Sequence, residues 1–197
     1  MANGYEQTYY LMRKSLAGLD FAGRAQDLGL SPPEGGTQRL TFLGHDYWVD
    51  ETGVYPEGSD NTSFNTRSVI IYYLTYGGKG EASYDFRTMH SFSHGLFEGD
   101  SSSSKWGTAY KGPRLSLEFF EAAAKRIGAE FMQKKNGAHS YLLFPFPKVP
   151  ALLTYNEGDD EFPDDMVIKF GTNALNFLPF ETLAVLHGLI VRSLTRD

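Results

Sequence analysis

The chain has 197 residues and contains no cysteine. This absence excludes disulfide bonds, thiolate nucleophiles, zinc sites with cysteine ligands and cysteine-bound iron–sulfur clusters. The start of the sequence lacks the basic and apolar regions of a signal peptide, and the longest apolar runs are shorter than the ~20 residues of a membrane span. We therefore expect a cytoplasmic protein with no membrane partner.

Positive charge is also scarce. The chain has 18 lysines and arginines against 24 aspartates and glutamates, which gives a net charge of −6. Basic residues occur at most in pairs such as Lys134–Lys135, whereas a protein that binds a phosphate backbone needs a basic patch. The composition therefore excludes nucleic acid as the main partner.

The composition, with 41% hydrophobic and 15% aromatic residues, indicates a folded protein that is rich in aromatic side chains. Apolar periodicity and terminal signals predict helices over residues 5–19, 20–28, 67–76, 114–127 and 180–194. Strands are expected over residues 38–51 (a hairpin), 81–89, 129–135, 140–146, 149–155 and 165–170. Because strands and helices do not alternate strictly, we predict an α+β fold with a largely antiparallel sheet, N-terminal helices and a buried C-terminal helix.

The length fits a single globular domain over residues 1–197. Residues 91–113 are rich in Ser and Gly, which predicts a mobile loop. Pro113 suits the first turn of the helix that follows, and Glu121 and Lys125 have the spacing of an ion pair on its surface. Near the end of the last helix, Arg192 and Arg196 lie where the helix dipole favours positive charge.

Familiar catalytic and nucleotide-binding motifs are absent: there is no P-loop, no G-x-G-x-x-G, no G-x-S-x-G and no H-E-x-x-H. His90 and His94 have the four-residue spacing that on a helix places two imidazoles on one face and allows them to bind a metal. The surrounding sequence, HSFSHGLFEGD, is poor helix material. Solvated loop histidines are the alternative interpretation.

The stretch GDDEFPDDMVIKF concentrates five carboxylates, from Asp159, Asp160, Glu161, Asp164 and Asp165. Close carboxylates repel one another, which raises the pKa of at least one unless a cation neutralises them. Such a cluster suits a general acid or a hard cation. It does not match an EF-hand, and a charged turn that keeps two strands soluble is the alternative.

Residues 149–191 resemble the C-terminal half of a bacterial and archaeal family, common in anaerobes, that is catalogued as domain of unknown function 3786. The resemblance is carried by a lead-in P-x-x-P at Pro147 and Pro150, the acidic D-E-F-P at 160–163, an I-x-F strand at Ile168 and Phe170, and L-P-x-E-x-L at 178–183. Upstream, FLGHDYWV, YYLTY and DFRTM look like weaker signatures of the same family.

The resemblance implies no assigned activity. Some longer members resemble iron–sulfur proteins in a Cys-rich segment that precedes this domain, but the present chain has no cysteine to bind a cluster. The resemblance also implies that the D-E-F-P motif has a role beyond keeping the turn soluble. We predict that Arg87, at the end of a strand, pairs with Asp160 or Glu161, since guanidinium binds carboxylate in a bidentate manner. This pair either pins the sheet or forms a polar site with Tyr84 and Trp106 as walls.

Three functional hypotheses follow, and the sequence identifies no cofactor for any of them. The leading one is a non-enzymatic binding or accessory module for a small ligand or protein partner, with Tyr84, Trp106 and Tyr110 as contacts. The alternative is a hydrolase or lyase that uses Asp160 or Glu161 for acid–base chemistry, with or without a divalent metal at His90 or His94. A homodimer formed through exposed aromatic side chains is the third.

Overall fold

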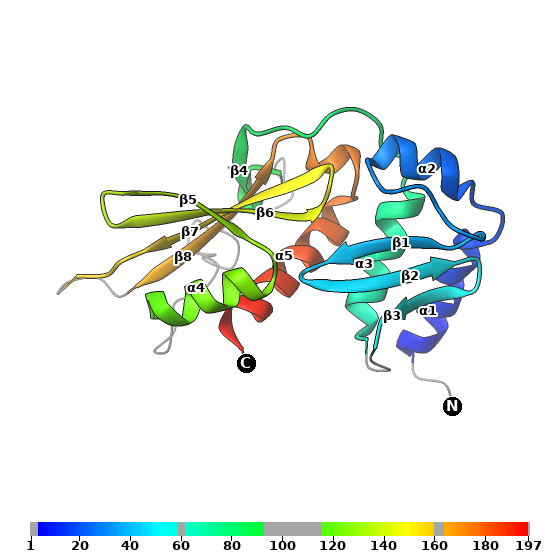
Figure 1. Cartoon of the computed structure of the whole chain (residues 1–197), viewed down its shortest axis with the longest axis horizontal. Helices are drawn as coiled ribbons and strands as arrows, with labels where there is room; N and C mark the ends of the chain where they lie inside the picture. The colour runs from blue at the N-terminus through cyan, green and yellow to red at the C-terminus, as the bar shows by residue number, and fades with distance from the viewer. Residues whose placement is uncertain (1–3, 59–61, 93–115, 160–163, 197) are drawn as a thin grey trace.

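The computed structural model describes residues 4–58, 62–92, 116–159 and 164–196. These residues form an α+β fold with two antiparallel sheets, as the sequence predicts (Figure 1). One hydrophobic cluster runs through both sheets and the helices between them. Among the described helices, none combines the length and apolar character that crossing a bilayer requires.

The smaller sheet has the order β1-β2-β3. Its strands are β1 (Gln38–Phe42), β2 (His45–Asp50) and β3 (Gly53–Pro56). β1 and β2 form the predicted hairpin, which turns at Leu43 and Gly44, both with positive φ. Burial alternates along β1, so one face of the sheet packs on the core and the other faces solvent.

The larger sheet is an antiparallel meander with one strand added at its edge, in the order β4-β8-β7-β6-β5. Its strands are β4 (Phe86–Thr88), β5 (Glu130–Lys135), β6 (Ala138–Phe146), β7 (Val149–Asn156) and β8 (Asp165–Gly171). The four strands predicted between residues 129 and 170 are thereby confirmed. The strand predicted over 81–89 is correct only over residues 86–88: residues 81–85 are not in a strand, and the chain enters a 3-10 turn, η2 (Met89–Phe92), directly after β4.

The helices lie beside and between the sheets (Figure 1). They are α1 (Gly4–Arg13), α2 (Phe21–Leu28), α3 (Phe64–Thr75), α4 (Leu117–Arg126) and α5 (Phe180–Thr195), with short 3-10 turns η1 (Lys14–Leu16) and η3 (Ala174–Asn176). α5 is the predicted buried C-terminal helix, and it packs against α3. Asp20 caps α2, and Gly29 ends it in the left-handed conformation.

Two predictions about α4 are wrong. The helix begins at Leu117 rather than at Pro113, because the Ser116 hydroxyl accepts a hydrogen bond from the Phe119 backbone N–H (3.2 Å) and caps the first turn. Pro113 itself lies outside the described residues. Glu121 does not pair with Lys125; its carboxylate instead accepts a hydrogen bond from the Tyr141 hydroxyl (2.9 Å) on β6.

Tyr73 joins α3 to the rest of the core. Its ring is fully buried and stacks on Phe146 of β6, with centroids 4.0 Å apart and planes within 7°. The hydroxyl donates to the Leu28 carbonyl at the end of α2 and accepts from the backbone N–H of Lys148. Burial raises the pKa of this phenol above its ordinary value. Because Tyr73 bonds to both of these segments, α3 is held in a fixed position for the site described next.

Candidate functional site

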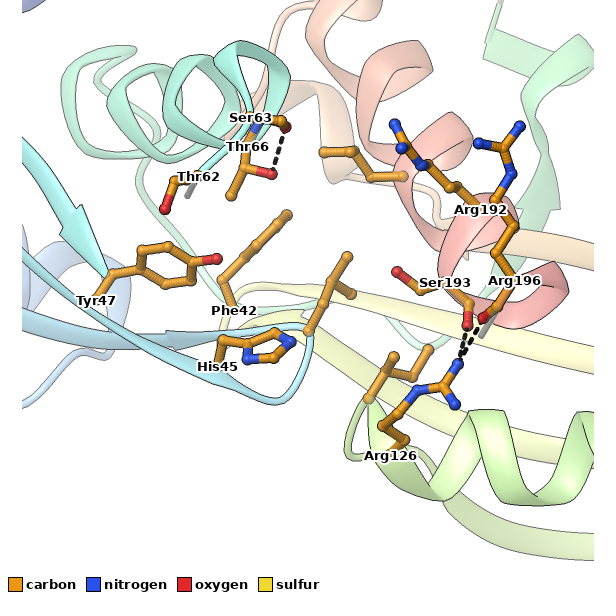
Figure 2. Close-up of a pocket in the computed structure, with 13 residues that line it drawn as sticks. Phe42, His45, Tyr47, Thr62, Ser63, Thr66, Arg126, Arg192, Ser193 and Arg196 are labelled. Carbon is orange, nitrogen blue, oxygen red and sulfur yellow. Dashed lines mark hydrogen bonds between the residues drawn. The ribbon is translucent and has the colours of Figure 1, made fainter. Parts of the chain in front are cut away.

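A cleft of about 520 Å³ lies where the tip of the β1–β2 hairpin meets the ends of three helices (Figure 2). The N-terminus of α3 and the C-termini of α4 and α5 converge on it. A volume of this size is typical of small-molecule sites. Its lining residues are Phe42, Leu43, His45, Tyr47, Thr62, Ser63, Thr66, Arg126, Ile127, Leu189, Arg192, Ser193 and Arg196.

Gly44 fixes the hairpin wall of the cleft against α4. Its φ of 79° lies in the left-handed region, and a Cβ at this position would overlap with the carbonyl oxygen of Arg126 and press on the Cα of Ile127. Only glycine permits both the turn and the close approach. The hairpin tip therefore rests directly on the last turn of α4.

Three arginines form the opposite wall. The Arg126 guanidinium donates to the carbonyl oxygens of Ser193 (2.9 Å) and Arg196 (2.8 Å), so it caps the C-terminal end of α5. Arg192 projects from α5 and Arg196 from the position directly after it, and their guanidinium groups extend away from that of Arg126 (Figure 2). Both are exposed, and their guanidinium groups make no hydrogen bond or ion pair within the described residues.

Hydroxyl groups line the α3 side. The Ser63 hydroxyl caps α3 by accepting from the Thr66 backbone N–H (3.1 Å), and it lies 2.9 Å from the Thr66 hydroxyl. The positive end of the α3 dipole is at this point. Tyr47 and His45 add a phenol and an imidazole from β2 (Figure 2). Burial raises the pKa of Tyr47, so this phenol stays protonated and able to donate.

The electrostatic character of the cleft differs from that of the whole molecule. Among the described residues, its lining contains three arginines, a histidine and several residues with hydroxyl groups, and none with a carboxylate side chain. The protein as a whole carries a net charge of −6. Phe42, Ile127 and Leu189 add apolar atoms to the lining; Phe42 and Ile127 are buried, and Leu189 is half-buried. Such a cleft suits an anion that carries an apolar body.

A second cavity, of about 640 Å³, lies beside Trp48 and includes Arg39 and Asp46. Here Arg39 and Asp46 are already paired, since Arg39 bonds Asp46 (2.9 Å) and Glu57 (3.1 Å) and its guanidinium lies over the Trp48 ring, and Glu34 adds a further carboxylate to the lining. The hydrogen bond from Thr41 and the Arg39 guanidinium lower the pKa of Asp46. We therefore take the cleft at the end of α5 as the stronger candidate.

Of the residues singled out in the sequence, Tyr84, Arg87 and His90 are described. Tyr84 is 60% exposed and makes edge contacts with Phe86 and Phe144. The Arg87 guanidinium lies 3.5 Å from Asp85, and both side chains are mostly exposed. His90 belongs to η2. None of the three lines the cleft.

The remaining predicted site residues, His94, Trp106, Tyr110, Asp160 and Glu161, lie outside the described residues. Their roles, and the pairing of Arg87 with the acidic turn, stay predictions. In the register of the larger sheet Arg87 lies opposite Phe170, near the end of β8, whereas the acidic turn precedes the start of that strand.

The described carboxylates of the acidic turn are bound locally. Asp164 accepts from the Gly158 backbone N–H (2.7 Å), and Asp165 accepts from the Asn156 amide (2.5 Å). Glu157 bonds both Lys134 (2.9 Å) and His139 (2.7 Å). These two partners, Lys134 foremost, lower the pKa of the Glu157 carboxyl.

His139 is the buried member of this network, with its other ring nitrogen 4.0 Å from Glu121. Within residues 4–58, 62–92, 116–159 and 164–196, no three His, Cys, Asp or Glu side chains are grouped as metal ligands. The metal site predicted at His90 and His94 stays untested, because His94 is outside these ranges. The acid–base hypothesis at Asp160 and Glu161 is untested for the same reason.

The cleft arginines could not be found by motif reading. Arg126 ends one helix, and Arg192 and Arg196 end another more than sixty positions later, with strands β5 to β8 between them in sequence. Two signals were present: Arg192 and Arg196 near the end of the last helix, and the Leu43-Gly44-His45 turn in FLGHDYWV. The first marks a helix end and the second a tight hairpin, but neither shows which elements pack together.

A family model described as "Domain of unknown function (DUF3786)" matches residues 20–193. The chain belongs to this family. No curated protein and no solved structure matches it. The family match confirms the resemblance read from the C-terminal half and brings no assigned activity.

Several residues that suggest DUF3786 membership have a structural explanation. Ile168 and Phe170 are buried in β8, and Leu178 and Leu183 are buried at the start of α5. The matched span also contains Gly44 and the cleft residues up to Ser193. These four signature residues of this DUF3786 chain therefore belong to its core, whereas the D-E-F-P at 160–163 lies outside the described residues.

Proposed function

We propose that this protein binds a small organic anion in the cleft at the end of α5. The ligand class is a phosphate or carboxylate head group joined to an apolar body. The observation that carries the proposal is the lining, which in the described part of the chain combines three arginines, His45 and the α3 N-terminus and includes no Asp or Glu. Of the two partners considered for a non-enzymatic binding module, a small ligand and a protein, the proposal takes the small ligand.

The three arginines differ in their hydrogen bonds, and this difference supports the proposed anion site. Arg126 is occupied with the carbonyls of α5, so its role is to hold the wall in place. Arg192 and Arg196 have guanidinium groups available for the anion, and hydrogen bonds to charged groups contribute about 1.5–3 kcal/mol each. Ser63 and Thr66 offer hydroxyl groups from the opposite wall.

The apolar residues indicate why an organic anion is expected rather than a bare inorganic ion. Phe42, Ile127 and Leu189 line the cleft together with the arginines and the hydroxyl groups, and of these three Leu189 is the one that is not fully buried. A ligand that spans the cleft would cover the exposed part of Leu189 and gain roughly 25 cal/mol per Å² of buried apolar surface.

A thermal-shift panel tests the proposal. The purified chain is melted with inorganic phosphate, pyrophosphate, aromatic and aliphatic phosphate esters and di- and tricarboxylates, each against sodium chloride at equal ionic strength. A ligand at a hundred times its Kd adds about 2.7 kcal/mol, or roughly 5–10 °C in melting temperature. The proposal fails if no anion exceeds the sodium chloride control.

A neutral analogue of each active compound provides the matched control. The ester or amide of an active acid keeps the apolar body and removes the charge. It should give less than a tenth of the affinity of the parent anion. Equal binding of the neutral analogue would show that the arginine wall does not select the ligand.

A further inference from the structure

The outer edge of β5 carries no neighbour in the part of the chain that the structure describes. β5 is the last strand of the larger sheet, and all six of its residues are exposed. Phe131 and Met132 are each 57% exposed. An edge strand presents a row of backbone N–H and C=O groups that can pair with another strand, and exposed apolar side chains on it favour association.

The other edge of the same sheet is different. β4 has only three residues, and a 3-10 turn follows it directly. A very short edge strand offers few groups for pairing. The β5 edge is therefore the one on which a further strand can be added.

The sequence of β5 is complementary to itself in one direction. It reads Glu130-Phe131-Met132-Gln133-Lys134-Lys135. In an antiparallel pair of two copies, with the two-fold axis between Met132 and Gln133, Glu130 lies opposite Lys135 at both ends. A parallel in-register pair would place like charges opposite each other, which is destabilising. Neither Glu130 nor Lys135 makes an ion pair within the described residues.

The irregularity in β5 makes this register geometrically consistent. On β6, Phe131 pairs with Tyr141 and Lys134 pairs with His139, and a shift in register lies between Phe131 and Gln133. Tyr141 and His139 are two residues apart, so they share a face of the sheet. Phe131 and Lys134 therefore also share that face, although a spacing of three in a regular strand would separate them.

A two-fold axis perpendicular to a sheet keeps each residue on its own face. Phe131 of one copy then lies opposite Lys134 of the other on the α4 face, and Glu130 lies opposite Lys135 on the reverse face. A lysine near an aromatic ring adds a favourable cation–π contact. Lys134 also bonds Glu157 (2.9 Å), which follows β7 on the inner side of β5, so the contact with the partner's ring competes with this ion pair.

We propose that two copies of this chain associate through antiparallel pairing of β5, which joins their larger sheets into one continuous sheet. The partner is a second copy rather than another protein because the charges, the register shift and the faces all match under a two-fold axis. A contact of six residues a side is small, and small interfaces are weak. The dimer therefore forms in a concentration-dependent manner.

Sedimentation equilibrium of the full chain between about 5 µM and 1 mM tests the register with a charge exchange. The wild-type mass should rise from 22.0 kDa toward twice that value. Glu130→Lys and Lys135→Glu should each weaken dimerisation at least tenfold, because each places like charges opposite one another twice. The double variant, with both changes in one chain, should restore dimerisation to within about threefold of the wild type.

Three outcomes overturn the proposal: a chain that stays monomeric throughout, a dimer that neither single variant weakens, or a double variant that is not restored. Both charges lie on an exposed strand, so folding is checked simply by an unchanged melting temperature. The outcome is independent of the cleft, since no β5 residue lines it. Anion affinity should be equal in all four proteins.

Discussion

The cleft at the end of α5 gathers arginines, and the turn between β7 and β8 gathers carboxylates. In the turn, Asp164, Asp165 and Glu157 are bound by groups from the same turn or the adjacent strands. In the cleft, the guanidiniums of Arg192 and Arg196 have no such partner within the described residues, and the helix that faces them presents its positive end.

This difference separates charge that supports the fold from charge that is available to a ligand. A carboxylate that accepts hydrogen bonds from its own turn lowers the energy of that turn and leaves little capacity for another molecule. Cations that converge from different elements repel one another and are offset only when an anion binds. The comparison predicts that changes on the cleft side affect binding, whereas changes in the turn affect stability only slightly.

The largest effect is expected from Gly44→Ala. The new methyl group would overlap with the Arg126 carbonyl oxygen, and the residue would be forced to keep a left-handed backbone. The left-handed conformation costs about 1–2 kcal/mol and overpacking about 1–3 kcal/mol. Thermal denaturation should show a melting temperature lower by roughly 5–15 °C.

Gly36→Ala is the matched control for this change. Gly36 also has a positive φ, of 83°, but no atom lies within 4 Å of the Cβ it would gain. The free energy of unfolding of Gly36→Ala should therefore fall only by the cost of the left-handed backbone, about 1–2 kcal/mol. If the two variants melt at the same temperature, the hairpin does not rest on α4 as described, and the cleft wall is not rigid.

The next effect concerns Arg192→Gln and Arg196→Gln. Each removes one charge from the proposed anion site, so each should weaken binding of an active anion about tenfold to a hundredfold, the equivalent of one charged hydrogen bond. Isothermal titration calorimetry measures this directly. The melting temperature without ligand should stay the same, because neither side chain bonds within the described structure.

Arg87→Gln provides the control for charge alone. It removes the same charge from β4, outside the cleft, and should leave anion affinity unchanged after correction for ionic strength. A loss of affinity equal to that of Arg192→Gln would mean that the overall charge of the protein, rather than the cleft, governs binding.

A third prediction uses the buried side of the helix that carries these arginines. His187 on α5 is buried near Phe170, and burial lowers its pKa from 6.5 to about 4. The folded state therefore binds a proton less readily than the unfolded state. The associated stability is complete above pH 6.5 and is lost as the pH falls from 6.5 toward 4.

Between pH 7 and pH 5 this difference amounts to roughly 1–2 kcal/mol for one histidine. Melting curves at the two pH values measure it. His187→Leu should reduce the drop in melting temperature by a matching amount, whatever its own stability at pH 7. An unchanged drop in the variant would show that other groups cause the acid sensitivity.

The sequence predicts much of this fold because the decisive signals are local. The cap at Asp20, the left-handed Gly29 and the alternating strands after residue 129 each depend on neighbours within a few positions. The start of α4 is misplaced because Pro113 and Ser116 are competing start signals, and the serine hydroxyl decides. The cleft depends on tertiary packing that brings Arg126 to the last carbonyls of α5, and no local pattern encodes that contact.

The smallest effect is expected in the acidic turn, from Glu157→Gln. The amide keeps the shape of the side chain and weakens the bonds to Lys134 and His139, but Glu157 and Lys134 are well exposed, so water replaces much of what is lost. The lowered pKa of Glu157 means that its contribution is present near neutral pH and fades as the pH falls below its ordinary value of 4.5. We expect a smaller drop in melting temperature than for Gly36→Ala, and no change in anion affinity. A loss of affinity here would contradict the division between bound and available charge, because it would connect the turn to the cleft.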